Sequence, residues 1–361
     1  MSLSFYVHIP YCVKRCGYCD FNTYTPQELL DGATLPQVSG DYIDAVLLEL
    51  ESAPRDSVST IFFGGGTPSL LPAHDLGRVI TAIRERNSLT DSCEITLEAN
   101  PDSVDIEKLW ELRTVGFNRI SFGMQSSAAH VLKVLDRTHN PDNVKRAVDA
   151  ARAAGFSSIS VDLIYGTPGE SLEDWRSTVE AALQLDIDHI SAYALIIESG
   201  TKLAAQIKRG EVAAPQDDLM ADMYSLADHM FTEAGLEWYE LSNWAKPGHQ
   251  CRHNLAYWHS ANWWGLGPGA HSHIDGKRFW NTKHPTTYKN ALFNGTTPIA
   301  DSEKLTPEQK RDEELMLTIR LRKGIYAQPE TAVSLEKFVD SGHLQKMGER
   351  YVQIGRASCR E

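Results

Sequence analysis

The feature that most constrains the fold is a regular alternation, up to about residue 195, of short β-branched or aromatic runs with longer segments of helical period. The candidate strands are Phe5–Ile9, Val58–Phe63, Glu94–Glu98, Arg119–Phe122, Ser158–Ile164 and His189–Leu195. The helical segments between them are Tyr42–Glu51, Leu76–Arg86, Ile106–Val115, Asn143–Ala154 and Leu172–Leu185. Six strand–helix repeats predict an α/β fold with a parallel sheet, and six are fewer than a closed eightfold barrel needs. We therefore expect a partial (βα)6 TIM-type barrel with its site at the carboxyl ends of the strands.

The alternation fades after residue 200. A helical pattern covers Asp217–Ala234, a segment rich in Trp, His, Asn and Gly runs from Trp238 to His284, and an amphipathic helix is expected over Pro307–Arg322. In that helix we expect Leu315, Met316, Ile319 and Leu321 to face inward. These patterns predict a smaller, mostly helical C-terminal region. The expected units are a barrel over residues 1–200, a barrel-closing segment over 201–300, a helical region over 301–352 and a foreign tail over 353–361.

Charge and cysteine usage restrict the setting and the partners. The chain carries 35 Lys and Arg against 48 Asp and Glu, for a net charge of −13, and no basic run, which argues against nucleic-acid binding. The amino end lacks a secretory signal pattern, and no segment approaches the roughly 20 apolar residues of a membrane span. Three of the six cysteines fall within eight residues and three are scattered, unlike a disulfide framework. We expect a cytoplasmic protein with reduced thiols.

The clustered cysteines are the strongest candidate site. Cys12, Cys16 and Cys19 follow the first predicted strand with C-x₃-C-x₂-C spacing. Three thiolates this close repel one another and oxidise easily unless metal separates them. A structural zinc site wants four ligands, and no fourth Cys or His lies nearby. An iron–sulfur cubane held by three cysteines leaves one iron open to a small molecule, which suits soft thiolate ligands. A zinc site and an incidental turn remain as alternatives.

A glycine-rich turn, Gly64–Pro68, follows the second predicted strand. Glycines there let the backbone approach a ligand closely, and we expect exposed N–H groups to meet a ligand carboxylate. Neither the dinucleotide pattern nor the P-loop pattern is present. A plain turn is the alternative.

The run from Tyr6 to Phe21, which holds the cysteines, resembles the signature of the radical S-adenosylmethionine (SAM) superfamily. Within it the run is similar to the branch that contains anaerobic coproporphyrinogen III oxidases and the HemW-type haem chaperones. The resemblance implies a [4Fe–4S] cluster on Cys12, Cys16 and Cys19, with SAM chelating the open iron. In this superfamily one-electron reduction cleaves the sulfonium and yields a 5′-deoxyadenosyl radical, so competence to cleave SAM is implied as well.

The resemblance also implies a set of SAM-binding positions, ordered along residues 5–200. These are Tyr6, Tyr18, Gly65, Gly66, Thr67, Glu98, Gln125, Arg137 and Asp162. Their chemistry fits, because carboxylates suit an ammonium group and ribose hydroxyls and Arg137 suits the methionine carboxylate. Each residue alone reads as a solvated or capping residue. Their joint occurrence in order carries the prediction.

The Trp/His-rich segment contains the second family-like motif. The run from His253 to Trp258 is similar to the motif associated with haem binding in HemW-type proteins, which implies haem contacts by His253, Tyr257 and Trp258. Imidazole is a common axial ligand of haem iron, and flat aromatic faces suit a porphyrin. A hydrogen-bonded core histidine is the alternative, and Cys251 is a weaker ligand candidate. The family-like run Gly267–Ser272 reads otherwise as a tight turn at the barrel mouth.

Two departures favour the chaperone over the oxidase within that branch. Phe21 stands where the oxidases have a fourth cysteine, and only eleven residues precede Cys12, too few for the oxidase extension. The alternatives are an oxygen-independent coproporphyrinogen III oxidase, an enzyme of another radical reaction and a simple iron–sulfur electron carrier. The implied partners are haem, a reductant protein of flavodoxin, ferredoxin or bacterioferritin type, and an acceptor haemoprotein, with respiratory proteins among the candidates. The resemblance covers about residues 5–325, so we expect the last family helix to be missing.

Overall fold

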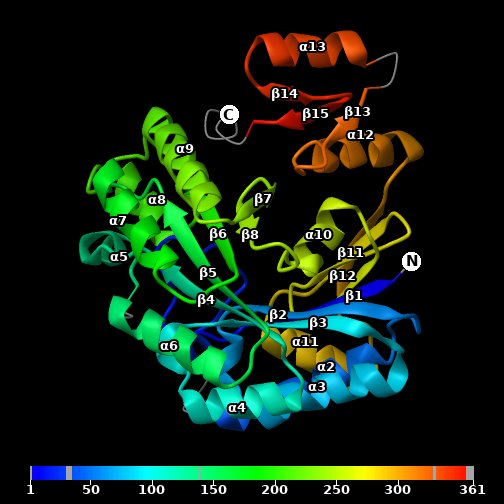
Figure 1. The fold of residues 1–361 in the computed structure, drawn as a ribbon. Helices are drawn as coiled ribbons and strands as arrows, with labels where there is room; N and C mark the ends of the chain where they lie inside the picture. Colours follow the sequence, from blue (N-terminus) through cyan, green and yellow to red (C-terminus); the bar gives the residue numbers. More distant parts are fainter. Residues whose placement is uncertain (1, 30–34, 138–139, 328–330, 355–361) are drawn as a thin grey trace.

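Six parallel strands in chain order form the centre of the molecule (Figure 1). The structure is a computed structural model that describes residues 2–29, 35–137, 140–327 and 331–354. The strands are β1 (Leu3–Ile9), β2 (Val58–Gly65), β3 (Leu89–Ala99), β4 (Arg119–Gln125), β5 (Ser158–Tyr165) and β6 (His189–Ala194). Each pairs in parallel with the next, which confirms the predicted partial barrel.

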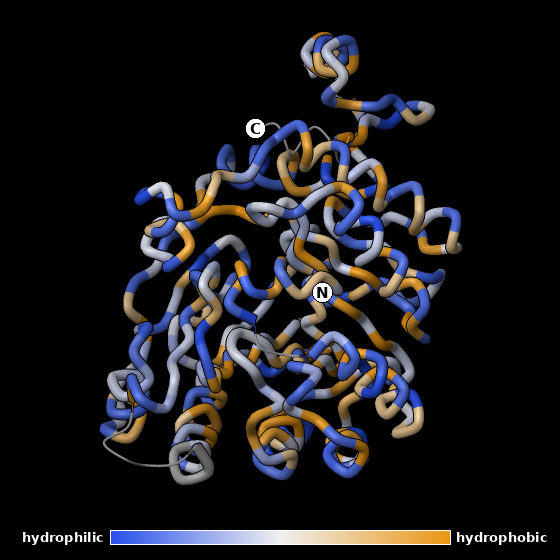
Figure 2. Tube along the Cα trace, turned by 90° about the vertical axis from the view of Figure 1, so that its left-hand side faces the viewer, coloured by the Kyte–Doolittle hydropathy of each residue, from blue (hydrophilic) through white to orange (hydrophobic). Residues whose placement is uncertain are grey.

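The helices between these strands cover the outer face of the sheet (Figure 1). The longer ones are α2 (Leu35–Leu50), α3 (Ala73–Arg86), α4 (Ile106–Val115), α6 (Pro141–Ala153) and α7 (Leu172–Leu183). Short α1 (Pro26–Leu29) and α5 (Ala129–Val134) and two 3₁₀ turns, Pro68–Leu70 and Pro101–Ser103, complete this half. Apolar and polar residues alternate along these helices (Figure 2), and their apolar faces join the strands in one core. None of the helices in the described ranges is long and apolar enough to cross a membrane.

The sheet continues beyond the barrel at both edges, and here the structure differs from the expectation of a mostly helical second region. It has twelve strands in the order β12-β11-β10-β9-β1-β2-β3-β4-β5-β6-β8-β7. The added strands are β7 (Glu237–Glu240), β8 (Asn243–Ala245), β9 (Trp263–Leu266), β10 (His271–Ile274), β11 (Lys277–Asn281) and β12 (Ile299–Lys304). Of these, β9 pairs with β1 and β8 pairs with β6, at the open edges of the partial barrel, whose free backbone groups need partners. Most are too short to show a sequence period.

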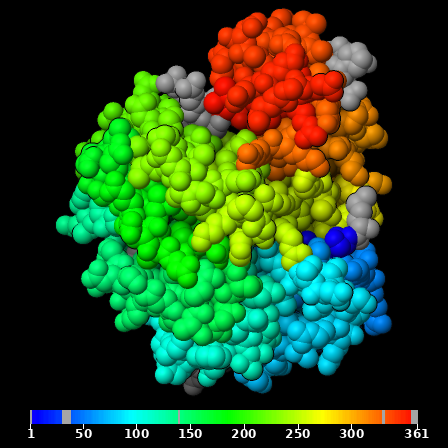
Figure 3. Space-filling model, in the orientation of Figure 1, coloured from blue at the N-terminus to red at the C-terminus, as the bar shows by residue number. Residues whose placement is uncertain are grey.

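Six further helices and a small sheet make up the rest of the described chain. The helices are α8 (Lys202–Lys208), α9 (Asp217–Glu233), α10 (Arg252–Trp258), α11 (Pro285–Phe293), α12 (Pro307–Thr318) and α13 (Ala332–Asp340). The small sheet has the order β13 (Ile325–Tyr326), β15 (Arg350–Gln353), β14 (Leu344–Met347). With α13 it encloses its own apolar cluster at the end of the molecule away from the barrel (Figures 2 and 3).

One prediction about burial is wrong. Leu315 and Met316 of α12 are 40% and 51% exposed, whereas Leu321, beyond the end of that helix, is buried. The helix lies on the surface, and only the chain that follows it packs inward, where Ile319 contacts the apolar cluster of the small sheet. From residue 355 the expected foreign tail, with Cys359, lies outside the described residues.

Candidate functional site

The cysteine loop leaves the carboxyl end of β1 and is held by backbone hydrogen bonds. The amide of Cys12 donates to the carbonyl of Tyr24 (3.0 Å). The glycine-rich turn after β2 supports the loop, because the amides of Gly66 and Thr67 donate to the carbonyls of Ile9 and Tyr11, each at 2.8 Å. A Cβ on Gly66 would lie 2.5 Å from the Tyr11 carbonyl oxygen, so a glycine is required there.

These bonds correct one expectation. The amides of the glycine-rich turn are not exposed, since Gly66 and Thr67 donate to the cysteine loop and the amide of Gly65 donates to Glu98 Oε2 (3.1 Å). The prediction that these N–H groups meet a ligand carboxylate is therefore wrong. The turn instead carries the loop.

The three thiols of the loop are half-buried, unpaired by disulfides and close enough to influence one another. Burial raises the pKa of Cys12 to about 11, and the neighbouring Cys19 and Cys16 add to the shift. The Thr67 hydroxyl lies 3.8 Å from Cys12 Sγ. Within the described residues no three His, Cys, Asp or Glu side chains are grouped around one metal-ion position. A four-iron cubane binds each thiolate through a different iron, so three cysteines can hold a cubane whose fourth iron stays open to a ligand.

Two carboxylates face each other inside the barrel, beyond the glycine-rich turn. Asp162 of β5 accepts from the Ser121 hydroxyl at 3.0 and 3.1 Å, and burial raises its pKa. Burial, then the charge of Asp162, raises the pKa of Glu98 to about 8. Tyr6, Phe62, Glu98 and Asp162, on strands β1, β2, β3 and β5, are each only half-buried. Carboxylates of this kind can bind cationic or hydroxyl groups of a ligand.

Arg137 links β4 to the cysteine loop. Its Nη1 lies 3.5 Å from Cys16 Sγ, its Nη2 donates to the carbonyl of Gly123 (2.9 Å), and its buried Nε has no partner. Gln125 lies beside it in a left-handed conformation (φ 63°), and a Cβ on Gly123 would lie 2.6 Å from Arg137 Nη2. An orphaned guanidinium donor is a group that a ligand carboxylate would satisfy. Thr138 and His139, which complete the Arg137 motif, lie outside the described residues.

The remaining two aromatic candidates flank these groups. Tyr18 packs against an apolar cluster that includes Val131 and Leu135. Burial raises the pKa of its hydroxyl, and the positive charge of Arg137 partly offsets that shift. Tyr6 hydrogen-bonds His8 Nδ1 (3.0 Å) and stacks on Phe62 with ring centroids 6.3 Å apart. Direct contacts join several of the predicted SAM-binding residues to one another or to the cysteine loop: Gly65 to Glu98, Thr67 to Cys12 and Arg137 to Cys16.

His253 lies deeper in the barrel and is 1% exposed. Its Nδ1 hydrogen-bonds the Thr60 hydroxyl (2.7 Å), its Nε2 hydrogen-bonds the Tyr257 hydroxyl (2.9 Å), and its ring stacks on Phe62. Burial lowers its pKa to about 3, which keeps the imidazole neutral. Trp258 is half-buried, with the Arg320 guanidinium over its ring. In this state both ring nitrogens of His253 are used within the protein.

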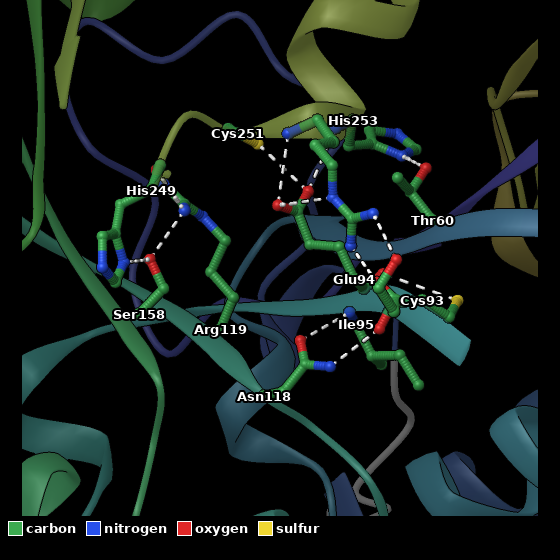
Figure 4. A network of polar contacts seen from close by, with 12 residues as sticks. Thr60, Cys93, Glu94, Ile95, Asn118, Arg119, Ser158, His249, Cys251 and His253 are labelled. Carbon is green, nitrogen blue, oxygen red and sulfur yellow. Dashed lines mark hydrogen bonds and ion pairs between the residues drawn. The ribbon is translucent and has the colours of Figure 1, made fainter. Parts of the chain in front are cut away.

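Glu94, which sequence reasoning missed, explains how His253 is placed (Figure 4). Its carboxylate accepts from the amides of Arg252 (3.2 Å) and His253 (3.0 Å), at the amino end of α10, and from the Cys251 thiol (3.7 Å). Thr60, which hydrogen-bonds His253, is the third residue of β2 and lies toward the amino end of that strand, whereas the cysteine loop follows the carboxyl end of β1. The two candidate sites therefore approach the lumen from opposite ends. The alternation Glu94, Thr96, Glu98 was the signal for inward carboxylates.

Asn22, also missed, ties the cysteine loop to the turn after β9. Its side-chain amide donates to the carbonyls of Pro268 (2.9 Å) and Lys283 (2.8 Å). The turn is held from the other side by the buried Glu49, which accepts from the Gly267 amide (2.8 Å). The family-like glycine run is thus a structural joint between the cysteine loop and α2.

Comparisons with known proteins agree with this geometry. A model of the Radical SAM superfamily matches residues 6–182. The protein named heme chaperone HemW in Mycobacterium tuberculosis is 44% identical over 97% of this chain and 90% of its own length. The chain belongs to the HemW family. The HemW of Synechocystis is 35% identical over 97% of the chain and 86% of that protein, and the HemW of Escherichia coli is 39% identical over 81% and 76%.

A solved structure shows the same fold at lower identity. Coproporphyrinogen III oxidase (HemN) from Escherichia coli has a TM-score of 0.82 and 22% identity, covering 99% of this chain and 88% of that one. This likeness confirms the predicted α/β partial-barrel architecture and says nothing about which member of the branch this chain resembles in function.

Proposed function

We propose that this HemW-family protein is a haem chaperone of the radical SAM class, which binds a [4Fe–4S] cluster, SAM and haem and transfers haem to an acceptor haemoprotein. The observation that carries the proposal is the identity, between 34% and 44%, to several proteins named heme chaperone HemW over most of their length. The free cysteine triad and the half-buried carboxylates of Glu98 and Asp162 support it.

Cys12, Cys16 and Cys19 would hold the cluster. Burial raises the pKa of the Cys12 and Cys19 thiols, so iron binding must displace protons there and assembly should be favoured by higher pH. Bound cluster and SAM supply one-electron chemistry at the sulfonium. Arg137 is placed to offset thiolate charge at Cys16 and to bind a carboxylate with its free Nε.

SAM would lie in the polar lumen beneath the loop. Because the amides of Gly65, Gly66 and Thr67 are used, we assign these residues to the methionine ammonium through carbonyl and hydroxyl oxygens. Glu98 and Asp162 would bind ammonium or ribose hydroxyl groups, and a cationic ligand would favour the ionised form of Glu98, whose pKa is about 8 without it. Tyr6, Tyr18 and Gln125 would complete the wall.

Haem binding by His253, Tyr257 and Trp258 requires a rearrangement. A neutral imidazole is the form that ligates iron, and burial keeps His253 neutral. Iron can bind a ring nitrogen of His253 only if the hydrogen bond from that nitrogen to the hydroxyl of Tyr257 or Thr60 is broken. We therefore assign haem binding to a state in which α10 has shifted from the lumen. Cys251 is a poor ligand, since burial raises the pKa of its thiol to about 12.

The reductant is assigned to the flavodoxin, ferredoxin or bacterioferritin type and the acceptor to haemoproteins, with respiratory proteins among the candidates. We assign no nucleic-acid partner, because a net charge of −13 repels the phosphate backbone. Free thiols in all five described cysteines support a reducing, cytoplasmic location.

The test is anaerobic reconstitution with iron and sulfide, followed by haem titration with and without SAM. We expect four-iron absorption, a Soret band and haem transfer to an apoprotein. Conversion of coproporphyrinogen III to protoporphyrinogen IX with SAM and reductant would favour the oxidase instead. Zinc in place of the four-iron cluster would contradict the proposal.

The haem ligand is tested by His253→Ala beside a matched control, His189→Ala. His189 is also a buried lumen histidine, with its ring nitrogens bonded to Ser160 (2.8 Å) and Tyr239 (2.7 Å). Both variants lose two hydrogen bonds, so both should lose stability. Only His253→Ala should lose haem affinity and alter the Soret band. Equal haem affinity in the two variants would rule out His253 as the ligand.

A further inference from the structure

Three lysines gather around Asp136 on the outer side of the cysteine loop, and we call Lys14, Lys133 and Lys202 the lysine patch. Lys14 forms an ion pair with one oxygen of Asp136, and Lys202 Nζ lies 2.7 Å from the other. Two surface cavities of about 320 and 210 Å³ meet at Lys133 and Asp136, and Lys14 and Lys202 each line one of them. Residues from the loop, α5 and α8 thus form one continuous basic surface.

The patch is positive although the chain as a whole is acidic. Asp136 is the only carboxylate among the residues that line the two cavities, against the three lysines and Arg137. Lys133 is exposed and makes no ion pair within the described part of the chain, and Lys202 is 62% exposed. A local positive surface on a chain of net charge −13 selects for an acidic partner.

The patch is also next to the proposed cluster. Lys14 stands between Cys12 and Cys16 in the chain, and Arg137, which lines the larger cavity, reaches Cys16 Sγ with its Nη1 (3.5 Å). Val13, beside Lys14, is 71% exposed and offers an apolar contact on the same loop. Electron-transfer complexes are typically small and transient, with charge steering the encounter.

We propose that the lysine patch is the docking surface for the reductant, a small acidic protein that donates single electrons. The inference rests on the proposed function, since delivering an electron here has meaning only if the cysteines hold a cluster. In the step, the donor loses one electron and the cluster gains it, while no bond forms or breaks in this chain. The lysines steer and hold the donor and take no part in the chemistry.

The experiment compares Lys133→Glu with Lys277→Glu on the reconstituted protein. Lys277 is an exposed lysine of β11, opposite Lys304 on β12, on the far side of the sheet from α5 (Figure 1). Binding of oxidised flavodoxin is measured at equilibrium, and cluster reduction is timed with reduced flavodoxin and with reduced methyl viologen. We expect Lys133→Glu to weaken flavodoxin binding and slow reduction by flavodoxin about five- to tenfold at low ionic strength, and less in 0.5 M salt. Lys277→Glu and the viologen reaction should not be slowed.

Several outcomes would overturn the docking surface. One is that Lys133→Glu binds flavodoxin and is reduced by it as well as wild type. Another is that Lys277→Glu loses as much flavodoxin binding as Lys133→Glu. A third is that wild type does not bind flavodoxin. A fourth is that, in sedimentation, wild type self-associates and Lys133→Glu does not, with no difference in flavodoxin binding. That result would assign the patch to a second copy of this acidic chain and would also overturn the proposal. A wild type that forms no four-iron cluster would contradict the proposed function itself.

Discussion

Removing the side chain of Asn22 should loosen the cysteine loop from the segment that follows β9. Asn22 donates two hydrogen bonds to the carbonyls of Pro268 and Lys283 and accepts a longer one from the Tyr24 hydroxyl (3.2 Å). At about 1 kcal/mol for each of the two short bonds, Asn22→Ala should lower the free energy of unfolding by about 2 kcal/mol. Because Asn22 lies three residues after Cys19, the loss should fall on the loop itself.

The matched control is Asn87→Ala. The Asn87 side-chain amide also donates two hydrogen bonds to backbone carbonyls, those of Pro54 (3.0 Å) and Asp56 (3.1 Å), in a part of the barrel that does not touch the loop. The two variants should therefore lose similar stability in urea unfolding. They should differ in how fast an iron chelator removes the cluster.

The assay is bleaching of the four-iron absorption by bathophenanthroline under anaerobic conditions. We expect Asn22→Ala to lose its cluster several times faster than wild type and Asn87→Ala to match wild type. If both variants lose stability equally and keep the cluster equally long, the reasoning that Asn22 secures the cysteine loop is refuted.

Three further predictions follow from burial and charge. Burial raises the pKa of Glu49 from 4.5 to about 7. Between about pH 4.5 and 7 the folded state therefore keeps a proton that the unfolded chain releases. The free energy of unfolding should fall by roughly 3 kcal/mol across that range. In urea unfolding, Glu49→Gln should show a fall smaller by this amount than wild type, and an unchanged slope would contradict the assignment. Glu98→Gln should keep the cluster but bind SAM about tenfold more weakly in equilibrium dialysis, because a lost charged contact is worth roughly 1.4 kcal/mol. If the variant bound SAM with full affinity, Glu98 would not belong to the SAM site. Leu321→Ala should lower the free energy of unfolding in urea by about 2–3 kcal/mol, and Met316→Ser by less than about 0.5 kcal/mol. The reverse order would mean that Met316, and not Leu321, faces the core.

The elements that could be predicted are those whose signal is local. Each barrel strand is a run of β-branched or aromatic residues, and each helix has apolar residues at helical spacing, so one pass along the chain finds them. The same holds for Gly155, which follows α6 at φ 88°, the conformation expected of a glycine that ends a helix. The cysteine triad is local too, since three ligands lie within eight residues.

The expectations that were wrong needed distant partners. The glycine-turn amides were expected to face a ligand, but those of Gly66 and Thr67 are taken by Ile9, at the end of β1, and by Tyr11, in the loop that follows it. Leu315 and Met316 have a helical apolar spacing, yet whether that face meets a core depends on what folds over it. Asn22 and Glu94 carry no local motif and act through residues far along the chain.

The sequence by itself therefore determined the barrel, the cysteine triad and the order of the lumen residues, because periodicity and ligand spacing are properties of neighbouring residues. Only the tertiary structure decided that His253 hydrogen-bonds Thr60, 193 residues away, and meets the lumen from the end opposite the cysteines. It likewise decided that lysines from three separate elements surround one aspartate. Such contacts depend on where the chain returns after many intervening residues, and hydrogen bonds and ion pairs form only between groups that folding brings within about 3 to 4 Å.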